Sequence, residues 1–204
     1  METKFSGNTT KMIQMSLLFA IILLMAFTPI GYIKTLGLEI TLIVVPVVVG
    51  AIILGPKAGA FLGGVFGITS FIQCFGMSPF GAALLGINPI FTFIVCVIPR
   101  ILMGWLTGII FEKLNKKEKM KNISYFIANL LGPILNTVFF MSSLIILFYN
   151  TDFIQNLVST MGASNPISFV ILFVGINGVV EAIVCFVVGT AISKALNTVN
   201  IKRK

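Results

Sequence analysis

Two ionisable side chains, Arg100 and Glu181, lie deep inside long apolar stretches of this 204-residue sequence. If these stretches cross a membrane, both charges fall near its middle, where a charge is costly and is normally paired or functional. One interpretation is an ion pair that holds two helices together. The other is that the guanidinium of Arg100 offers its fork of donors to an anionic ligand, while Glu181 orients it. The sequence leaves both open.

Uncharged polar side chains accompany these two charges. Asn177 lies one turn before Glu181 on the same helix face, and Asn88 opens a helix whose first position holds Pro89. Each alone is more often an interhelical hydrogen bond than a ligand contact, but together they suit a pocket for a small polar organic molecule. We therefore predict a substrate site made of Arg100, Glu181, Asn177, Asn136, Asn88, Glu39 and Gln73.

The sequence lacks the motifs that most catalytic and metal sites need. It contains no histidine, no GxxxxGK[ST] loop and no GxSxG turn. Its three cysteines, Cys74, Cys96 and Cys185, lie in apolar runs without a CxxC spacing, so buried apolar side chains are their simplest interpretation. We therefore predict no catalytic residue, no metal site, no cofactor and no ATP binding, and we do not expect an enzyme.

The elements that must position these residues are membrane helices. Hydrophobic residues make up 57% of the chain and charged residues 10%, against about a quarter charged in soluble domains, and the mean hydropathy is +1.08. The apolar runs are continuous rather than alternating, which favours helices over a barrel. We predict an all-α polytopic membrane protein, a single membrane domain over 1–204, with six transmembrane helices at roughly 12–30, 38–54, 58–75, 87–111, 123–149 and 167–196.

The basic residues predict the orientation of these helices. An even number of spans puts both chain ends on one side, and that side would hold twelve of the 14 Lys and Arg residues, with Lys34 opposite and Arg100 within a span. The positive-inside rule then places both termini in the cytoplasm. Because membrane topology explains most of the net charge of +8, we do not expect a nucleic-acid partner.

Small residues recur at every fourth position in three of the predicted helices, with Gly104 and Gly108 in the helix predicted at 87–111. Gly59 and Gly63 belong to a series of glycines spaced by four, and Ser16 and Ala20 repeat this spacing in the first helix. Such a stripe lets another backbone approach closely. It serves either the packing of helices within the chain or docking onto another membrane subunit. Ser16, Ala20, Gly59 and Gly63 are the candidate docking residues.

Several stretches of the sequence carry a family resemblance: Gly37 to Thr41, Val49 to Ala60, Gly67 to Phe71, Val97 to Gly104, Asn177-Gly178 and Glu181 to Ile183. They resemble the substrate-binding (S) components of energy-coupling factor (ECF) transporters, the vitamin importers of prokaryotes. Within that family the sequence is most similar to the pantothenate-type group. The resemblance covers nearly the whole chain and implies the bundle of six membrane helices of an S component.

The resemblance implies vitamin uptake at the cell membrane of a prokaryote. An S component captures a water-soluble vitamin, here pantothenate, at the outer face among its last three helices and outer loops. Its first three helices dock onto a transmembrane coupling protein that two ATPases drive, and the S component topples in the bilayer to deliver the vitamin. The alternatives are another vitamin, such as pyridoxine or riboflavin, or a stand-alone carrier or channel without an ATPase.

Overall fold

A computed structural model of the protein describes residues 7–28, 31–33 and 40–202. Within these ranges the chain is almost entirely helical, with one antiparallel pair of two-residue strands in which Tyr32 pairs with Thr41. The elements in chain order are α1 (Gly7–Ala26), β1 (Tyr32–Ile33), β2 (Ile40–Thr41), α2 (Val44–Leu54), α3 (Pro56–Gln73), α4 (Pro79–Ile87), α5 (Pro89–Asn115), the 3-10 helix η1 (Glu118–Met120), α6 (Ile123–Phe148), α7 (Asp152–Thr160), α8 (Pro166–Val184), the π-helix η2 (Cys185–Gly189) and α9 (Thr190–Lys202).

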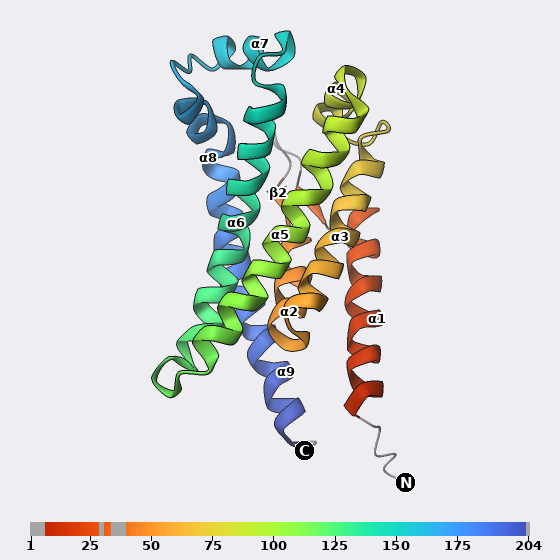
Figure 1. Ribbon diagram of the computed structural model, residues 1–204, viewed down its shortest axis with the longest axis vertical. Helices are drawn as coiled ribbons and strands as arrows, with labels where there is room; N and C mark the ends of the chain where they lie inside the picture. The colour runs from red at the N-terminus through yellow and green to blue at the C-terminus, as the bar shows by residue number, and fades with distance from the viewer. Residues whose placement is uncertain (1–6, 29–30, 34–39, 203–204) are drawn as a thin grey trace.

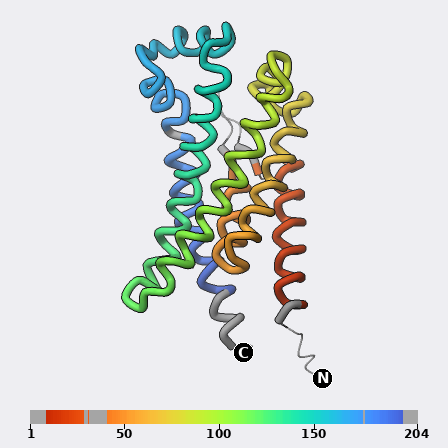
Figure 2. The backbone as a smooth tube through the Cα atoms, in the orientation of Figure 1, coloured from red at the N-terminus to blue at the C-terminus, as the bar shows by residue number. Residues whose placement is uncertain are grey.

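The long helices form an elongated bundle (Figure 1). α5 and α6 run antiparallel along most of its length, α1 lies beside α3, and α8, η2 and α9 follow one another along α6. α1 begins and α9 ends toward one end of the bundle, which we call the terminal end. The short helices α4 and α7 lie at the opposite, distal end, where α7 runs crosswise between α6 and α8 (Figure 2).

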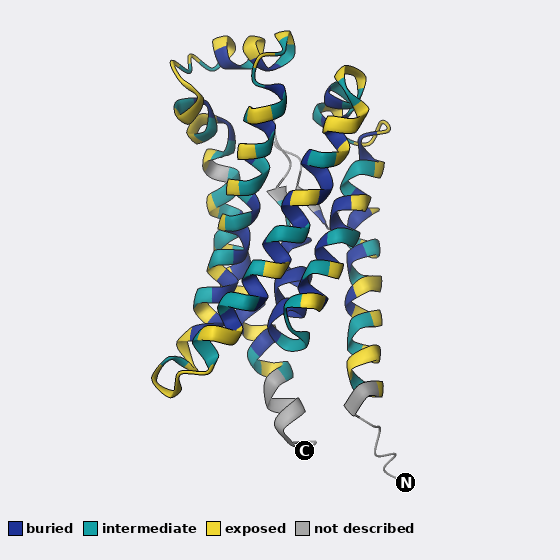
Figure 3. Cartoon of the chain, viewed as in Figure 1, coloured by how far each residue is buried: buried dark blue, intermediate teal, exposed yellow. Residues whose placement is uncertain are grey.

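The short helix α2 lies inside the bundle. Nine of its eleven residues are buried, and it contacts α1, α3, α5, α6 and α9. It ends at Gly55, whose φ of 96° suits glycine, and Pro56 then occupies the first turn of α3. Exposed residues instead lie on the outward face of α1, on α7 and around the turn between α5 and α6 (Figure 3).

α3 packs against α5 through glycines. A Cβ atom added at Gly59 would collide with the backbone carbonyl of Gly104, and one at Gly63 would collide with that of Arg100. A Cβ at Gly67 would likewise meet the backbone of α5. The glycine stripe therefore serves the close approach of two helices within the chain.

Four helical stretches of the described residues are long and apolar enough to cross a membrane: Thr9–Ala26, Pro89–Asn115, Ile123–Phe148 and Asn177–Leu196. The prediction of an all-helical membrane protein is confirmed, but two of the six predicted spans are not of this kind. The span predicted at 38–54 differs most, because its helix begins only at Val44. Eleven residues at 1.5 Å each give about 16 Å, against a hydrocarbon core of about 30 Å.

Irregular helix geometry and additional short helices also differ from the prediction. The predicted sixth span is interrupted at Gly175, which has φ 13° and ψ −103°, and again by the π-helix η2. The two interruptions flank the segment of α8 that carries Asn177 and Glu181, and π-helices are frequent at functional sites. α4 and α7 lie almost entirely between the predicted spans, where no helix is predicted.

Candidate functional site

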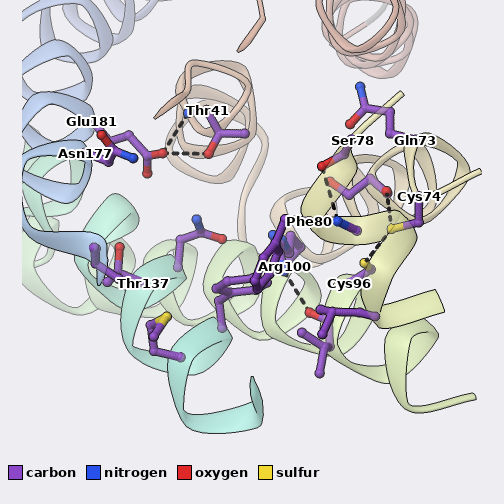
Figure 4. Close-up of a pocket in the computed structure, with 18 of the residues that line it drawn as sticks. Thr41, Gln73, Cys74, Ser78, Phe80, Cys96, Arg100, Thr137, Asn177 and Glu181 are labelled. Carbon is purple, nitrogen blue, oxygen red and sulfur yellow. Dashed lines mark hydrogen bonds between the residues drawn. The ribbon is translucent and has the colours of Figure 1, made fainter. Parts of the chain in front are cut away.

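A cavity of about 330 Å³ lies among the helices in the distal half of the bundle. β2, α3, α4, α5, α6 and α8 contribute to its walls, which brings together segments that are far apart in the sequence (Figure 4). Its volume is at the small end of the range for ligand pockets, and its walls mix polar with apolar side chains. Five of the seven predicted substrate residues line it: Gln73, Arg100, Asn136, Asn177 and Glu181.

The orientation of Arg100 follows from the proline that precedes it. Pro99 lies inside α5 and has no N–H, so the carbonyl of Val95, four residues earlier, loses its helical donor. Nη1 of Arg100 donates to that carbonyl at 2.7 Å. The proline thus leaves a carbonyl inside the helix without its helical donor, and Arg100 donates to this carbonyl instead.

Two aromatic rings contact the guanidinium of Arg100. Its Cζ lies 4.5 Å from the centroid of the Phe140 ring on α6 and 5.4 Å from that of the Phe66 ring on α3. Both distances are within the range of cation–π attraction. Because the side chain is only 8% exposed, water screens its charge weakly, and an anionic group placed beside the guanidinium would be attracted to it.

Glu181 takes its hydrogen bonds from the strand that precedes α2. Its Oε1 accepts from the backbone N–H of Thr41 at 2.7 Å and from the hydroxyl of Thr41 at 2.6 Å. These bonds join β2 to α8 at the edge of the cavity. Arg100 and Glu181 line the same cavity and interact electrostatically, and each also has a hydrogen bond to a neutral group of its own.

Asn136 is a buried side chain of the cavity whose amide oxygen lacks a hydrogen-bond donor within the described ranges. Its side chain is 5% exposed and lines the cavity from α6, and its Oδ1 has no hydrogen-bond partner among the described residues. A buried oxygen without a donor is unusual in a folded protein and costs about 1–3 kcal/mol. A hydroxyl or an amide N–H of a bound ligand would supply the missing donor.

Gln73 and Asn177 line the cavity from different helices. Nε2 of Gln73 donates to the backbone carbonyl of Ala26, so this side chain joins the end of α3 to the end of α1. Asn177 lies beside Glu181 on α8, across from the part of the wall that α3 forms (Figure 4).

Two predicted substrate residues are not placed in the cavity. Asn88 is the N-cap of α5, and its Oδ1 accepts from the backbone N–H groups of Ile90 and Phe91 at 3.0 and 3.1 Å. It is not among the residues that line the cavity, so the structure assigns it to the helix cap instead. Glu39 lies outside the described residues.

Sequence reasoning missed several cavity residues. The bond from Thr41 to Glu181 was not predicted either, because it joins residues 140 positions apart and no local pattern reveals it. Cys74 and Cys96 are buried free cysteines, as predicted, yet they also line the cavity. The other lining residues that were missed include Ser70, Ser78, Phe80, Thr137 and Phe140.

An aromatic contact joins the short helices of the distal end beside the cavity. Phe80 lies on α4, whose N-cap Ser78 accepts from the N–H of Gly81 at 3.4 Å. The ring of Phe80 lies 5.3 Å from that of Phe173 on α8 and 5.8 Å from that of Phe153 on α7. α4 is thereby held against α7 and α8 where Phe80 lines the cavity.

The candidate docking residues lie in two different environments. Ser16 and Ala20 are exposed on α1, where a second membrane protein can reach them. Gly59 and Gly63 are buried against the backbone of α5. Packing within the chain therefore accounts for the two glycines, and an external docking face is available at Ser16 and Ala20.

Comparison with known proteins gives the family. The sequence matches the family described as "ECF transporter, substrate-specific component" over residues 10–193. It is 34% identical over 141 residues to the pantothenate transporter PanT of Leuconostoc mesenteroides subsp. mesenteroides, covering 65% of this chain and 67% of that protein. It is 31% identical over 166 residues to the pantothenic acid transporter PanT of Lactococcus lactis subsp. cremoris, covering 76% of each chain. The chain belongs to the substrate-specific components of ECF transporters, a family of transporter subunits rather than of enzymes.

Proposed function

We propose that this chain captures pantothenate at the outer face of a prokaryotic cell membrane and delivers it inward with a transmembrane coupling protein and two ATPases. Family membership supports the role in an ECF transporter, and the names of both relatives refer to pantothenate or pantothenic acid. The observation that carries the choice of ligand is a buried guanidinium, Arg100, in the same small cavity as the unsatisfied amide oxygen of Asn136.

Pantothenate suits this cavity because it combines a carboxylate with hydroxyl and amide groups. We expect its carboxylate to accept from the guanidinium of Arg100 in charge-assisted hydrogen bonds. A hydroxyl or the amide N–H would donate to Oδ1 of Asn136, and Asn177 and Glu181 would contact the remaining polar groups. A volume of about 330 Å³ also favours a small flexible vitamin over a fused-ring vitamin such as riboflavin.

The proposed topology is a single membrane domain over 1–204 with six crossings. The four long apolar stretches would supply four of them. α3 would supply the fifth, and the segment of β2 and α2, whose helix covers only about half of the membrane, would supply the sixth. The terminal end carries the lysine-rich turn between α5 and α6, so the positive-inside rule favours a cytoplasmic position for this end. The distal end, with the cavity, then faces outward.

We propose that α1 docks onto the coupling protein through Ser16 and Ala20. Both are small and exposed on the face of α1 that the rest of the chain leaves uncovered, and small residues allow two membrane helices to approach closely. Gly59 and Gly63 would contribute indirectly, because they set the position of α3 against α5.

Mass spectrometry and reconstitution test the proposed function together. Native mass spectrometry of the chain purified from cells supplied with pantothenate should show one retained molecule with the mass of pantothenate. Proteoliposomes that also contain the coupling protein and both ATPases should then take up pantothenate when ATP is present inside. Uptake by the chain alone would instead indicate a stand-alone carrier, and retention of pyridoxine or riboflavin would replace pantothenate as the substrate.

A further inference from the structure

Two of the three cysteines face each other in the wall of the cavity. Cys74, which follows α3, and Cys96, on α5, have their sulfur atoms 3.9 Å apart, and both line the cavity (Figure 4). Sγ of Cys74 also donates to the carbonyl of Ser70 at 3.3 Å. The third cysteine, Cys185, begins the π-helix and is not among the residues that line this cavity. Cys74 and Cys96 therefore form a pair in the wall of the cavity, whereas Cys185 is a single buried cysteine outside it.

The two sulfur atoms of the pair need little movement to join. A disulfide bond has an S–S distance of about 2.05 Å, so the two atoms, now 3.9 Å apart, would have to approach by about 2 Å. The helices that carry them already pack backbone to backbone where Gly67 meets Val97. Side-chain rotation at a fixed helix contact can supply much of this approach.

We propose that Cys74 and Cys96 form an oxidation-sensitive site, in which a small peroxide that enters the cavity converts the two thiols to a disulfide bond. One thiol gives up its proton, and its thiolate sulfur attacks a peroxide oxygen to form a sulfenic acid. The O–O bond breaks, and the released hydroxide takes up that proton to become water. The second thiol attacks the resulting sulfenic acid, the S–S bond forms, and a second water leaves. Two electrons pass from the thiols to one hydrogen peroxide molecule.

The disulfide would fix one wall of the substrate cavity. Cys96 lies one helical turn before Arg100 on α5, and Cys74 follows Gln73, which is bonded to α1. Cys74 also packs against α4, where a Cβ at Gly81 would lie 2.6 Å from its sulfur. Because the cross-link would join the end of α3, against which α4 packs, to α5, we expect ligand to exchange more slowly in the oxidised protein. This last effect rests on the proposed function, whereas the disulfide itself does not.

Thiol labelling of the purified full chain tests the proposal. The reduced protein in detergent is treated with hydrogen peroxide, denatured, labelled with N-ethylmaleimide and digested for mass spectrometry. We expect Cys74 and Cys96 to lose the label and to appear in one cross-linked peptide pair, about 2 Da lighter than the two reduced peptides together. Cys185 should keep its label, and dithiothreitol should restore the labelling of the other two cysteines.

Single cysteine variants provide the controls. Cys185→Ala should leave the cross-link unchanged, whereas Cys74→Ala and Cys96→Ala should each abolish it. Full labelling of Cys74 and Cys96 in the oxidised wild-type protein would overturn the proposal, as would sulfinic acid at either position without a cross-link. The labelling of the wild-type protein tests the proposal even if one of the variants fails to fold. A cross-linked protein that never binds pantothenate would contradict the proposed function and still support the disulfide.

Discussion

At the scale of single residues, Arg100 and Asn136 are the two side chains of the cavity on which the proposed binding depends most. Arg100 is fixed by the carbonyl of Val95 and contacts the rings of Phe66 and Phe140, so a ligand need not order it on binding. Oδ1 of Asn136 is buried without a hydrogen-bond donor among the described residues. A ligand that supplies this donor removes a destabilising feature of the free protein.

Replacement of Asn136 by leucine should weaken the binding of pantothenate without lowering the stability of the ligand-free protein. Leucine removes the unsatisfied oxygen, so the thermal unfolding midpoint of the ligand-free protein should not fall. Loss of one ligand hydrogen bond should cost about 1 kcal/mol, which weakens pantothenate binding roughly fivefold. Calorimetric titration and thermal unfolding in the same detergent measure both quantities.

Asn129→Leu is the matched control for this variant. Oδ1 of Asn129 is also buried without a partner, but Asn129 does not line the cavity. This variant should leave the Kd for pantothenate unchanged. An equal loss of affinity in both variants would mean that Asn136 acts through the fold rather than through a ligand contact.

At the scale of single elements, a missing hydrogen bond inside α5 sets the position of the charged side chain of Arg100. The carbonyl of Val95 is free because of Pro99, and it holds Arg100. Pro99→Ala should restore the helical bond to Val95 and compete with Arg100 for this carbonyl. We expect a higher thermal unfolding midpoint together with weaker pantothenate binding, measured by unfolding and by titration.

Pro89→Ala tests whether the effect belongs to the interior of the helix. Pro89 lies in the first turn of α5, where the missing N–H has no helical partner to lose. Pro89→Ala should change neither the affinity for pantothenate nor the orientation of Arg100. Unchanged affinity in Pro99→Ala would show that the freed carbonyl does not control the binding site.

The exposed face of α1 gives a second prediction at this scale. Ala20→Trp places a large ring where close helix approach is proposed, so uptake by the complete transporter should fall strongly while pantothenate binding by the isolated chain is retained. Ile146→Trp, at a position 79% exposed on α6, is the control and should transport normally. Normal uptake by Ala20→Trp would remove this face of α1 from the docking surface.

The positions of the long helices could be predicted from the sequence, because their apolar runs are bounded by Pro, Gly and polar residues. The span predicted at 123–149, for example, is α6 at Ile123–Phe148. Arg100 and Glu181, which line the cavity, could be named as candidate site residues because charges are rare in such runs. The bond from Thr41 to Glu181 could not, since it joins residues 140 positions apart. The helix α7 was also missed, because nine residues between two spans resemble a loop.

At the scale of the whole molecule, the candidate site and the basic residues lie at different ends of the bundle. The cavity lies in the distal half and the lysine-rich turn lies at the terminal end. This separation suits a subunit that binds its ligand on one side of a membrane and meets its partners elsewhere. The central claim is that the buried charge of Arg100 selects a small anionic vitamin.

Titration of the purified chain with pantothenate and with pantothenol tests that claim most directly. Pantothenol carries an alcohol in place of the carboxylate and is otherwise the same molecule. A hydrogen bond to a charged group contributes about 1.5–3 kcal/mol, so pantothenate should bind at least roughly tenfold more tightly than pantothenol, and Arg100→Met should remove this preference. Equal affinity of the wild-type chain for the two ligands would contradict the account.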